Sequence, residues 1–183
     1  MTIYVCRSFA EIDTGKFSEM VERGFGGRTL CGDYFDKISP NYVVLDTEGE
    51  AGEIYVGGAV VERPPMPAGV HFDYMDKLVV VPERQGNGRG RAIFNRVQME
   101  SPELCWRARD GNPWLEWYKG IADDRTQDSQ WHIFWRGLYG GSRDAAVNYA
   151  ATKPETLSPP ANGIIPVTNG ILLPGEMGEF PGT

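Results

Sequence analysis

The sequence predicts a single mixed α/β domain in which helices flank a central sheet. Short β-branched runs recur between turn residues, as expected for strands. Stretches with apolar residues at helical spacing alternate with these runs and predict amphipathic helices. A length of 183 residues suits one compact domain with its own core and is short for two.

The elements of the first half can be placed in order along the chain. Apolar residues at helical spacing predict a helix over 16–24, which a glycine would end. Two buried strands are expected over 42–46 and 54–61, joined as a hairpin by an acidic turn. The run 74–81 is the clearest strand of the chain, and it ends at Pro82.

The second half continues the alternation of strands and helices. After a glycine-rich turn, an apolar face predicts a helix over 91–100. Strict alternation predicts a strand over 104–109, followed by a loop that includes residues 112–120. A last strand is expected over 131–136, with its aromatic residues mainly on one side.

The composition changes beyond about Lys153, where prolines alternate with glycines. Such a segment cannot hold a regular helix. We therefore place the domain over 1–150 and a Pro/Gly-rich C-terminal tail over 151–183, expected to run extended over the surface or to be partly disordered. Apolar residues in this tail leave a docking role open.

The balance of charge restricts the partners. Lys and Arg number 18 against 25 Asp and Glu, and the net charge of -7 argues against a nucleic-acid surface. No apolar run reaches the roughly 20 residues that cross a bilayer, and the N-terminus lacks signal-peptide features. Three unpaired cysteines and two histidines argue against a disulfide framework and a metal site. We expect a cytoplasmic protein that binds no metal, nucleic acid or membrane.

A glycine-rich turn over 85–91 (QGNGRGR) joins the clearest strand to the following helix. It offers backbone N–H groups at a helix N-terminus, where the helix dipole favours an anion, and glycine lets the backbone approach a phosphate. A nucleotide P-loop would have lysine at position 91, and a dinucleotide-binding fingerprint would have glycine there. Because this residue is Arg91, neither pattern fits. Together with Arg84 and Arg89, this residue forms a cationic cluster in an acidic chain.

A second group of cations lies on the strand predicted over 104–109. Alternation places Arg107 and Arg109 on one face, opposite the apolar residues. Arginine binds carboxylates through a bidentate fork, so this pair suggests an acceptor substrate with a carboxylate. Lys77 is likewise unexpected inside a core strand. Spacing alone leaves internal salt bridges as an equal alternative, with acidic neighbours at Asp76, Asp110 and Glu116.

The pattern Gln85-x-x-Gly88-x-Gly90 resembles the acyl-CoA loop of the Gcn5-related N-acetyltransferase (GNAT) superfamily. The resemblance implies the GNAT acyl-CoA N-acyltransferase fold, with a mostly antiparallel central sheet flanked by helices. It also implies acetyl-CoA as the co-substrate, its pantetheine paired with the strand and its pyrophosphate held by the loop amides. The residues so implied are Leu78, Val79, Val80, Gln85, Gly86, Asn87, Gly88, Arg89, Gly90 and Arg91.

Further motifs occur in order along the chain: Tyr74-Met-Asp-Lys-Leu-Val-Val, the glycine-rich turn, Trp106-Arg-x-Arg-x-x-Asn-Pro113, Trp117-Tyr118 and Trp131-x-x-Phe-Trp-x-Gly137. Over about 17–141 the chain thereby resembles the acetyltransferase domain of N-acetylglutamate synthase, of the type joined to an amino-acid-kinase domain. The segment Asn112-Pro-Trp-Leu-Glu-Trp-Tyr118 departs from the Asn-Pro-x-Asn-Pro-Trp-Tyr of that family, which leaves the choice of acceptor open.

This resemblance implies roles for individual residues. Lys77, Arg107 and Asn112 would bind glutamate, and Arg109 belongs to the same substrate-binding set. The implied catalytic residues are Tyr118 and Asn112, with the tyrosine protonating the leaving CoA thiolate. No base is assigned, and a water relay or an aspartate on the cofactor strand are the candidates.

The function implied is acetyl-CoA-dependent N-acetylation of the α-amino group of L-glutamate, as in arginine biosynthesis, by direct transfer in a ternary complex. Two alternatives stay open: a GNAT enzyme for another small amine or amino acid, and a non-catalytic CoA-binding regulatory subunit. For a protein partner, both a homodimer and a separate amino-acid-kinase-like chain stay open.

Overall fold

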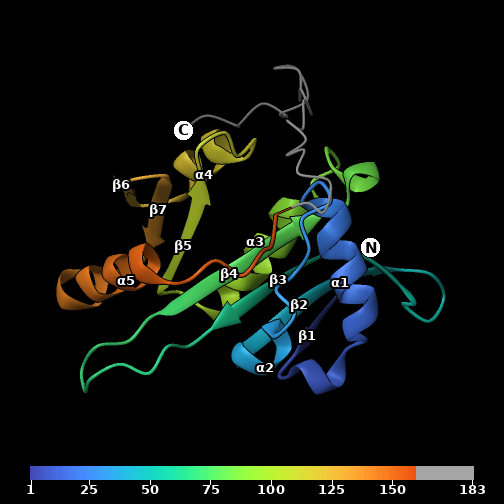
Figure 1. The fold of residues 1–183 in the computed structure, drawn as a ribbon, viewed down its shortest axis with the longest axis horizontal. Coiled ribbons are helices and arrows are strands. Elements are labelled where there is room, and N and C mark those ends of the chain that lie inside the picture. Colours follow the sequence, from blue (N-terminus) through green and yellow to red (C-terminus); the bar gives the residue numbers. More distant parts are fainter. Residues whose placement is uncertain (160–183) are drawn as a thin grey trace.

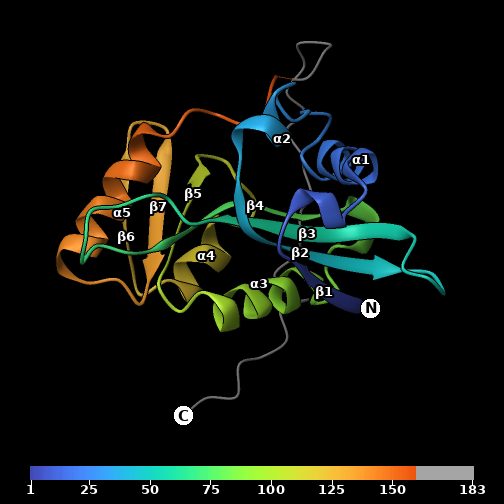
Figure 2. The same cartoon turned by 90° about the horizontal axis from the view of Figure 1, so that it is seen from below.

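The computed structural model describes residues 1–159, which build one seven-stranded sheet with helices on both faces (Figures 1 and 2). The elements in chain order are β1 (Thr2–Cys6), α1 (Thr14–Gly24), α2 (Tyr34–Lys37), β2 (Pro40–Glu48), β3 (Ile54–Glu62), β4 (Asp73–Val80), α3 (Arg89–Glu100), β5 (Leu104–Arg109), α4 (Leu115–Ile121), β6 (Asp124–Asp128), β7 (Trp131–Arg136) and α5 (Gly140–Thr152).

The strands lie in the order β1-β2-β3-β4-β5-β7-β6. The β4–β5 pair is parallel because α3 carries the chain back between these strands, and every other described pair is antiparallel. This topology confirms the expectation of a mostly antiparallel sheet flanked by helices.

Alternation along the strands gives the sheet two apolar faces, each covered by helices (Figure 2). One, called the α3 face, is covered by α3 and α4 and carries Tyr42, Met75, Trp106 and Phe134. The opposite one, called the α1 face, is covered by α1 and α5 and carries Val43, Val60, Tyr74, Cys105 and Ile133. Residues next to each other on a strand therefore serve different layers.

A β-bulge interrupts this alternation in the middle of β4. Val61 lies opposite Met75 and Val60 lies opposite Lys77, so that Asp76 is an extra residue in the ladder. The bulge lets Asp76 and Lys77 contact each other on the α1 face, although they are neighbours in the strand. Beyond the bulge, Leu78 joins the core of the α3 face.

β4 and β5 pair over only three residues and then diverge (Figure 1). Pairing runs from Asp73 with Leu104 to Met75 with Trp106. Beyond this point β4 pairs with β3 alone, and β5 pairs with β7 alone. From residue 76 to 80, one edge of β4 thus faces no strand in the described part of the chain. We call this stretch the unpaired edge of β4.

Most of the elements predicted from the sequence are confirmed. The strands expected over 42–46, 54–61, 74–81, 104–109 and 131–136 correspond to β2, β3, β4, β5 and β7, and the two expected helices are α1 and α3. The loop expected over 112–120 is wrong in part, because residues from Leu115 onward form α4. Its three aromatic side chains, which pack on the α3 face, favour the helix.

The C-terminal boundary predicted at residue 150 falls inside α5, which continues to Thr152. Residues 153–159 then cross the α1 face toward the loop after α1, drawn as the red segment of Figure 1. The rest of the predicted Pro/Gly-rich tail lies outside the described residues. None of the helices in the described range is long and apolar enough to cross a membrane.

Candidate active site

The glycine-rich turn bends sharply between the end of β4 and the start of α3. Gly86 and Gly88 have φ angles of 79° and 80°, in the left-handed region that favours glycine. The side-chain amide of Gln85 donates to the carbonyl of Val80 at 2.9 Å and ties the turn back to the strand. Because the first N–H groups of a helix have no partner within it, the turn presents donors to an anion.

Arg84, just before the turn, and Arg89, within it, pair with carboxylates of β2. Arg89 Nη1 lies 2.8 Å from the buried Asp46 Oδ2, and its other terminal nitrogen contacts Glu48. Arg84 Nη2 lies 2.9 Å from the same Glu48. These two members of the expected cationic cluster are thus neutralised within the chain. The backbone amides at the start of α3 are the donors that we expect to meet a phosphate group.

The bulge of β4 holds a buried ion pair. Lys77 Nζ lies 2.5 Å from Asp76 Oδ2, and both side chains are only 4% exposed. Tyr34 donates to the same carboxylate at 3.0 Å, and the hydroxyl of Thr156 contacts both charged groups. This bridge is one of the internal salt bridges that the sequence left as an alternative.

Burial and charge act on this pair in opposite directions. Burial lowers the pKa of Lys77, and the neighbouring carboxylate only partly opposes this. Burial would raise the pKa of Asp76, but Lys77 and Lys153 outweigh it, so that this pKa lies below its ordinary value. A carboxylate with a lowered pKa is a weak base, and Asp76 is better suited to holding the lysine than to accepting a proton.

Arg107 and Arg109 project from the α1 face of β5 and share one aromatic support. The Arg107 guanidinium carbon lies 3.9 Å from the Trp131 ring centroid, and that of Arg109 lies 4.9 Å away. Arg107 donates to the carbonyls of Ala150 and Pro154 at 2.5 and 3.2 Å. The acidic neighbours considered from the sequence are engaged elsewhere: Asp110 pairs with His132, and Glu116 pairs with Lys119.

A third arginine, which the sequence reasoning missed, lies beside this pair. Arg28 belongs to the loop after α1, and its Nη2 lies 3.3 Å from Glu155 Oε2. The other oxygen of the same carboxylate contacts Arg109. No local pattern links residue 28 to a strand about 80 positions later, because only the folded sheet brings them together. A carboxylate therefore already fits between Arg28 and Arg109.

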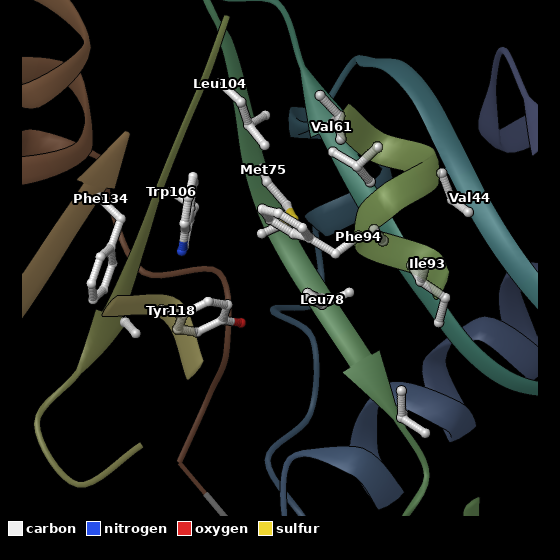
Figure 3. Close-up of a cluster of buried hydrophobic side chains, with 14 of the residues drawn as sticks. Val44, Val61, Met75, Leu78, Ile93, Phe94, Leu104, Trp106, Tyr118 and Phe134 are labelled. Atoms are coloured by element: carbon white, nitrogen blue, oxygen red, sulfur yellow. The ribbon is translucent and has the colours of Figure 1, made fainter. Parts of the chain in front are cut away.

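Tyr118 lies on the opposite, α3 face of the sheet. Its hydroxyl points from α4 toward β4 near Leu78 (Figure 3). Burial raises the pKa of Tyr118 above its ordinary value of 10.0, so the hydroxyl stays protonated at neutral pH. The indole N–H of Trp106, whose ring lies 5.9 Å from that of Tyr118, has no hydrogen-bond partner among residues 1–159.

Asn112 shapes the loop from which α4 starts. Its side-chain oxygen accepts a hydrogen bond from the backbone N–H of Trp114 at 2.8 Å. This contact holds the turn between β5 and α4. It thereby fixes where α4, the helix that carries Tyr118, begins. Cys105 is buried under α5, and burial raises the pKa of its thiol, which disfavours it as a nucleophile.

The predicted residues thus fall into two groups on the two faces of the sheet. Lys77, Arg107 and Arg109 lie on the α1 face, whereas Tyr118 lies on the α3 face and points toward β4. The glycine-rich turn lies at the end of the same strand. Within residues 1–159 no cluster of three or more His, Cys, Asp and Glu side chains could hold a metal ion.

The family model described as N-acetyltransferase of N-acetylglutamate synthase matches residues 4–152 of the chain. A protein of Xanthomonas campestris named acetylglutamate kinase is 32% identical over 82% of the chain and 34% of its own length. Human mitochondrial N-acetylglutamate synthase is 31% identical over 85% of the chain and 28% of its own length. The chain spans about a third of the length of these curated relatives.

Solved structures with the same fold include Arabidopsis thaliana NAA60 in complex with acetyl-CoA. It has a TM-score of 0.55 and 12% identity, over 74% of this chain and 98% of that chain. A Desulfovibrio desulfuricans protein described as a GNAT-family acetyltransferase has a TM-score of 0.53 and 17% identity, over 74% and 98% of the two chains. At these identities the likeness concerns the fold, and it confirms the expected GNAT fold.

Proposed function

The chain belongs to the family of the N-acetyltransferase domain of N-acetylglutamate synthase, and on this premise we propose that it transfers the acetyl group of acetyl-CoA to the α-amino group of L-glutamate. One observation carries the proposal. The unpaired edge of β4 lies between a glycine-rich turn at its end and three cations on the α1 face. A thioester held along this edge would have its sulfur close to an acceptor held by those cations.

The unpaired edge and the turn fit acetyl-CoA by their chemistry. Along Leu78, Val79 and Val80, alternate backbone groups face this edge, where no strand pairs with them. The amide groups of pantetheine can supply partners there, except at the Val80 carbonyl, which Gln85 already occupies. The left-handed glycines of the turn let amides at the start of α3 approach a pyrophosphate. The NAA60 structure, which has the same fold, is in complex with acetyl-CoA, and this supports acetyl-CoA as the ligand.

The acceptor side fits an amino acid with two carboxylates. Lys77, Arg107, Arg109 and Arg28 place four cations on one face, and the carboxylates of Asp76 and Glu155 offset two of these charges. The carboxylate of Glu155 between Arg28 and Arg109 supports a carboxylate site at that position. Human and Xanthomonas relatives bear names that refer to N-acetylglutamate, which makes glutamate the acceptor we favour.

The reaction follows from this placement of the two substrates. The acceptor amine attacks the thioester carbonyl, and a backbone N–H near Val79 stabilises the oxyanion that develops. The carbon–sulfur bond then breaks, and the thiolate takes the proton of Tyr118. The amine loses its own proton to solvent through a water relay. Holding both substrates by their anionic ends supplies much of the rate enhancement.

The product would be N-acetylglutamate, and we propose that the protein acts in arginine biosynthesis, in the cytoplasm as expected from the sequence. Xanthomonas and Xylella relatives are named acetylglutamate kinase, which supports an amino-acid-kinase-like partner, in the same or a separate chain. Size-exclusion chromatography with and without such a kinase would detect the complex. Elution unchanged by the kinase would argue against this partner.

Release of CoA thiol, measured with glutamate and a panel of other amino acids, tests the proposal. Arg107→Ala removes a charged hydrogen-bond donor to the acceptor and should raise the KM for glutamate about 10-fold or more. Arg125→Ala, on the exposed strand β6, is the control and should leave the KM unchanged. Faster turnover of another amino acid would identify that amino acid, and not glutamate, as the acceptor. If no amine is acetylated, the result favours a CoA-binding regulatory subunit.

A further inference from the structure

The segment 153–158, which follows α5, contacts each of the four cations of the acceptor site. Arg107 donates to the carbonyl of Pro154, and Lys77 contacts the hydroxyl of Thr156. Arg28 donates to the carbonyl of Leu157 at 3.3 Å. The segment therefore lies where an acceptor bound by these cations would have to lie.

The carboxylate of Glu155 bridges two of these cations. One of its oxygens contacts Arg109 and the other lies 3.3 Å from Arg28 Nη2, so that the two arginines share one anion. Glu155 is part of the protein, but its side-chain carboxylate is chemically the same as that of the proposed substrate glutamate. In the described structure, this carboxylate takes the place of an acceptor carboxylate.

The rest of the segment is held by backbone hydrogen bonds, by packing of Leu157 on the α1 face and by the ion pair of Lys153 with Glu62. A single β-bridge joins Leu157 to Leu30, flanked by hydrogen bonds from Cys31 N to Thr156 O at 3.1 Å and from Ser158 N to Thr29 O at 2.8 Å. Glu155 is 37% exposed, so water competes for its ion pairs. A ligand with its own carboxylate can exchange with Glu155 at little net cost, because the arginines keep an anion throughout.

We propose that Glu155 is an internal competitor of the acceptor, whose carboxylate displaces that of Glu155 from Arg28 and Arg109. The inference rests on the proposed function and concerns the affinity of the same site for its acceptor. An acceptor with a side-chain carboxylate replaces the anion that it displaces. Glutamine has an uncharged side chain and would leave the two guanidinium groups without an anion, at the modest cost of losing an exposed ion pair. Both acceptors have to displace Glu155, so Glu155 lowers the affinity for each of them without changing the ratio of the two affinities.

Glu155→Gln tests this competition, because the amide keeps the shape of the side chain and loses its charge. The KM for glutamate should fall about 2- to 5-fold, as expected for loss of an exposed ion pair, with kcat unchanged. The KM for glutamine should fall by the same factor, because both acceptors displace the same side chain. Glu100→Gln is the matched control, since Glu100 is also shared by two arginines, Arg7 and Arg96, at the far end of α3. Its kinetics should match the wild type.

Hydrogen exchange supplies a readout that does not depend on turnover. Saturating glutarate, a dicarboxylate without an amine, should speed exchange of the amides at 155–158 in the wild type. An unchanged or higher KM in Glu155→Gln would overturn the proposal while the acetyltransferase assignment stands. If neither the wild type nor any variant acetylates an amino acid, the proposed function fails and hydrogen exchange alone tests the displacement of Glu155. Faster exchange with glutarate then supports the displacement, and unchanged exchange overturns it.

Discussion

Gly90 leaves room for the indole of Trp114: a Cβ built on this glycine would lie 2.6 Å from Cη2 of the tryptophan. Such a distance is far too short for a van der Waals contact. Trp114 stands directly before α4, so its ring links the glycine-rich turn to the helix that carries Tyr118. The proposed phosphate site and the proposed proton donor therefore depend on one tertiary contact.

Replacement of Gly90 by alanine should weaken acetyl-CoA binding. The new methyl group must push Trp114 or the turn aside, so we expect the KM for acetyl-CoA to rise about 10-fold, an effect of about 1.4 kcal/mol. Trp114→Phe removes the ring atoms that clash, so Gly90→Ala should cost less in that background. Gly120→Ala, inside α4 and without a close neighbour, is the control and should stabilise the fold by about 0.5–1 kcal/mol. Equal effects of Gly90→Ala in both backgrounds would contradict this account.

Tyr118→Phe should slow the chemical step and leave acetyl-CoA affinity unchanged. The ring keeps its packing against Trp106 and Phe134, while the proton for the thiolate is lost. We expect kcat to fall about 100-fold, at the low end for general acid catalysis, because a thiolate is a fair leaving group. The raised pKa of Tyr118 keeps the wild type protonated, so the ratio of the two kcat values should stay constant from about pH 7 to 9. Steady-state kinetics and calorimetry check both parts. An unchanged kcat in Tyr118→Phe would argue against Tyr118 as the acid, and a ratio that shrinks toward pH 9 would contradict the raised pKa.

Trp131 should set the affinity for the acceptor through the two arginines that stack on it. Loss of two cation–π contacts, each about 0.5–1 kcal/mol, predicts that Trp131→Leu raises the KM for glutamate about 5- to 30-fold with little change in kcat. Trp131→Phe keeps an aromatic face and should retain most of the affinity. If the leucine and phenylalanine variants show the same KM, the aromatic face has no role in positioning the arginines.

Asp76→Asn should destabilise the fold because it leaves Lys77 buried without its anion. Breaking a buried ion pair costs about 3–5 kcal/mol, measured here by urea unfolding. The pKa of Asp76 is lowered in the folded state, so its contribution is complete above the ordinary value of 3.8 and is lost only as the pH falls through the lower folded value. The difference between variant and wild type should therefore stay constant from about pH 8 to 5.

An exposed pair provides the comparison for Asp76. Asp33 pairs with Lys37 on the surface of α2, and Asp33→Asn should change the free energy of unfolding far less. A difference between Asp76→Asn and wild type that already closes between about pH 6 and 5 would show a raised pKa and contradict the ion pair.

Much of the fold follows from local patterns. The alternation of β5 correctly separates Arg107 from Trp106, because the two sides of a strand face different layers. The strand, glycine-rich turn and helix around residue 88 are likewise local, since left-handed φ angles need glycine. Arg107, Arg109 and the glycine-rich turn could therefore be named from local patterns, whereas Tyr118 and Asn112 are implied by the family resemblance, and the roles of all of them stay predictions.

Other features depend on distant parts of the chain and leave no local pattern. Strict alternation would put Asp76 and Lys77 on opposite faces, and only the bulge against β3 lets them pair. β6 is polar and exposed at every residue, and exists because β7 offers it an edge. α5 starts with two glycines and buries only alanines as its core residues, which gives a weak helical pattern. The passage of Glu155 between two arginines is set by tertiary structure alone.

The central claim is that acetyl-CoA lies along the unpaired edge of β4 with its pyrophosphate on the glycine-rich turn. Hydrogen exchange of the backbone amides, followed with and without acetyl-CoA, tests it most directly. We expect slower exchange at 77–81 and 86–91, and no change at the amides of β1 or β6. Unchanged exchange at these two stretches in the presence of saturating acetyl-CoA would contradict the account.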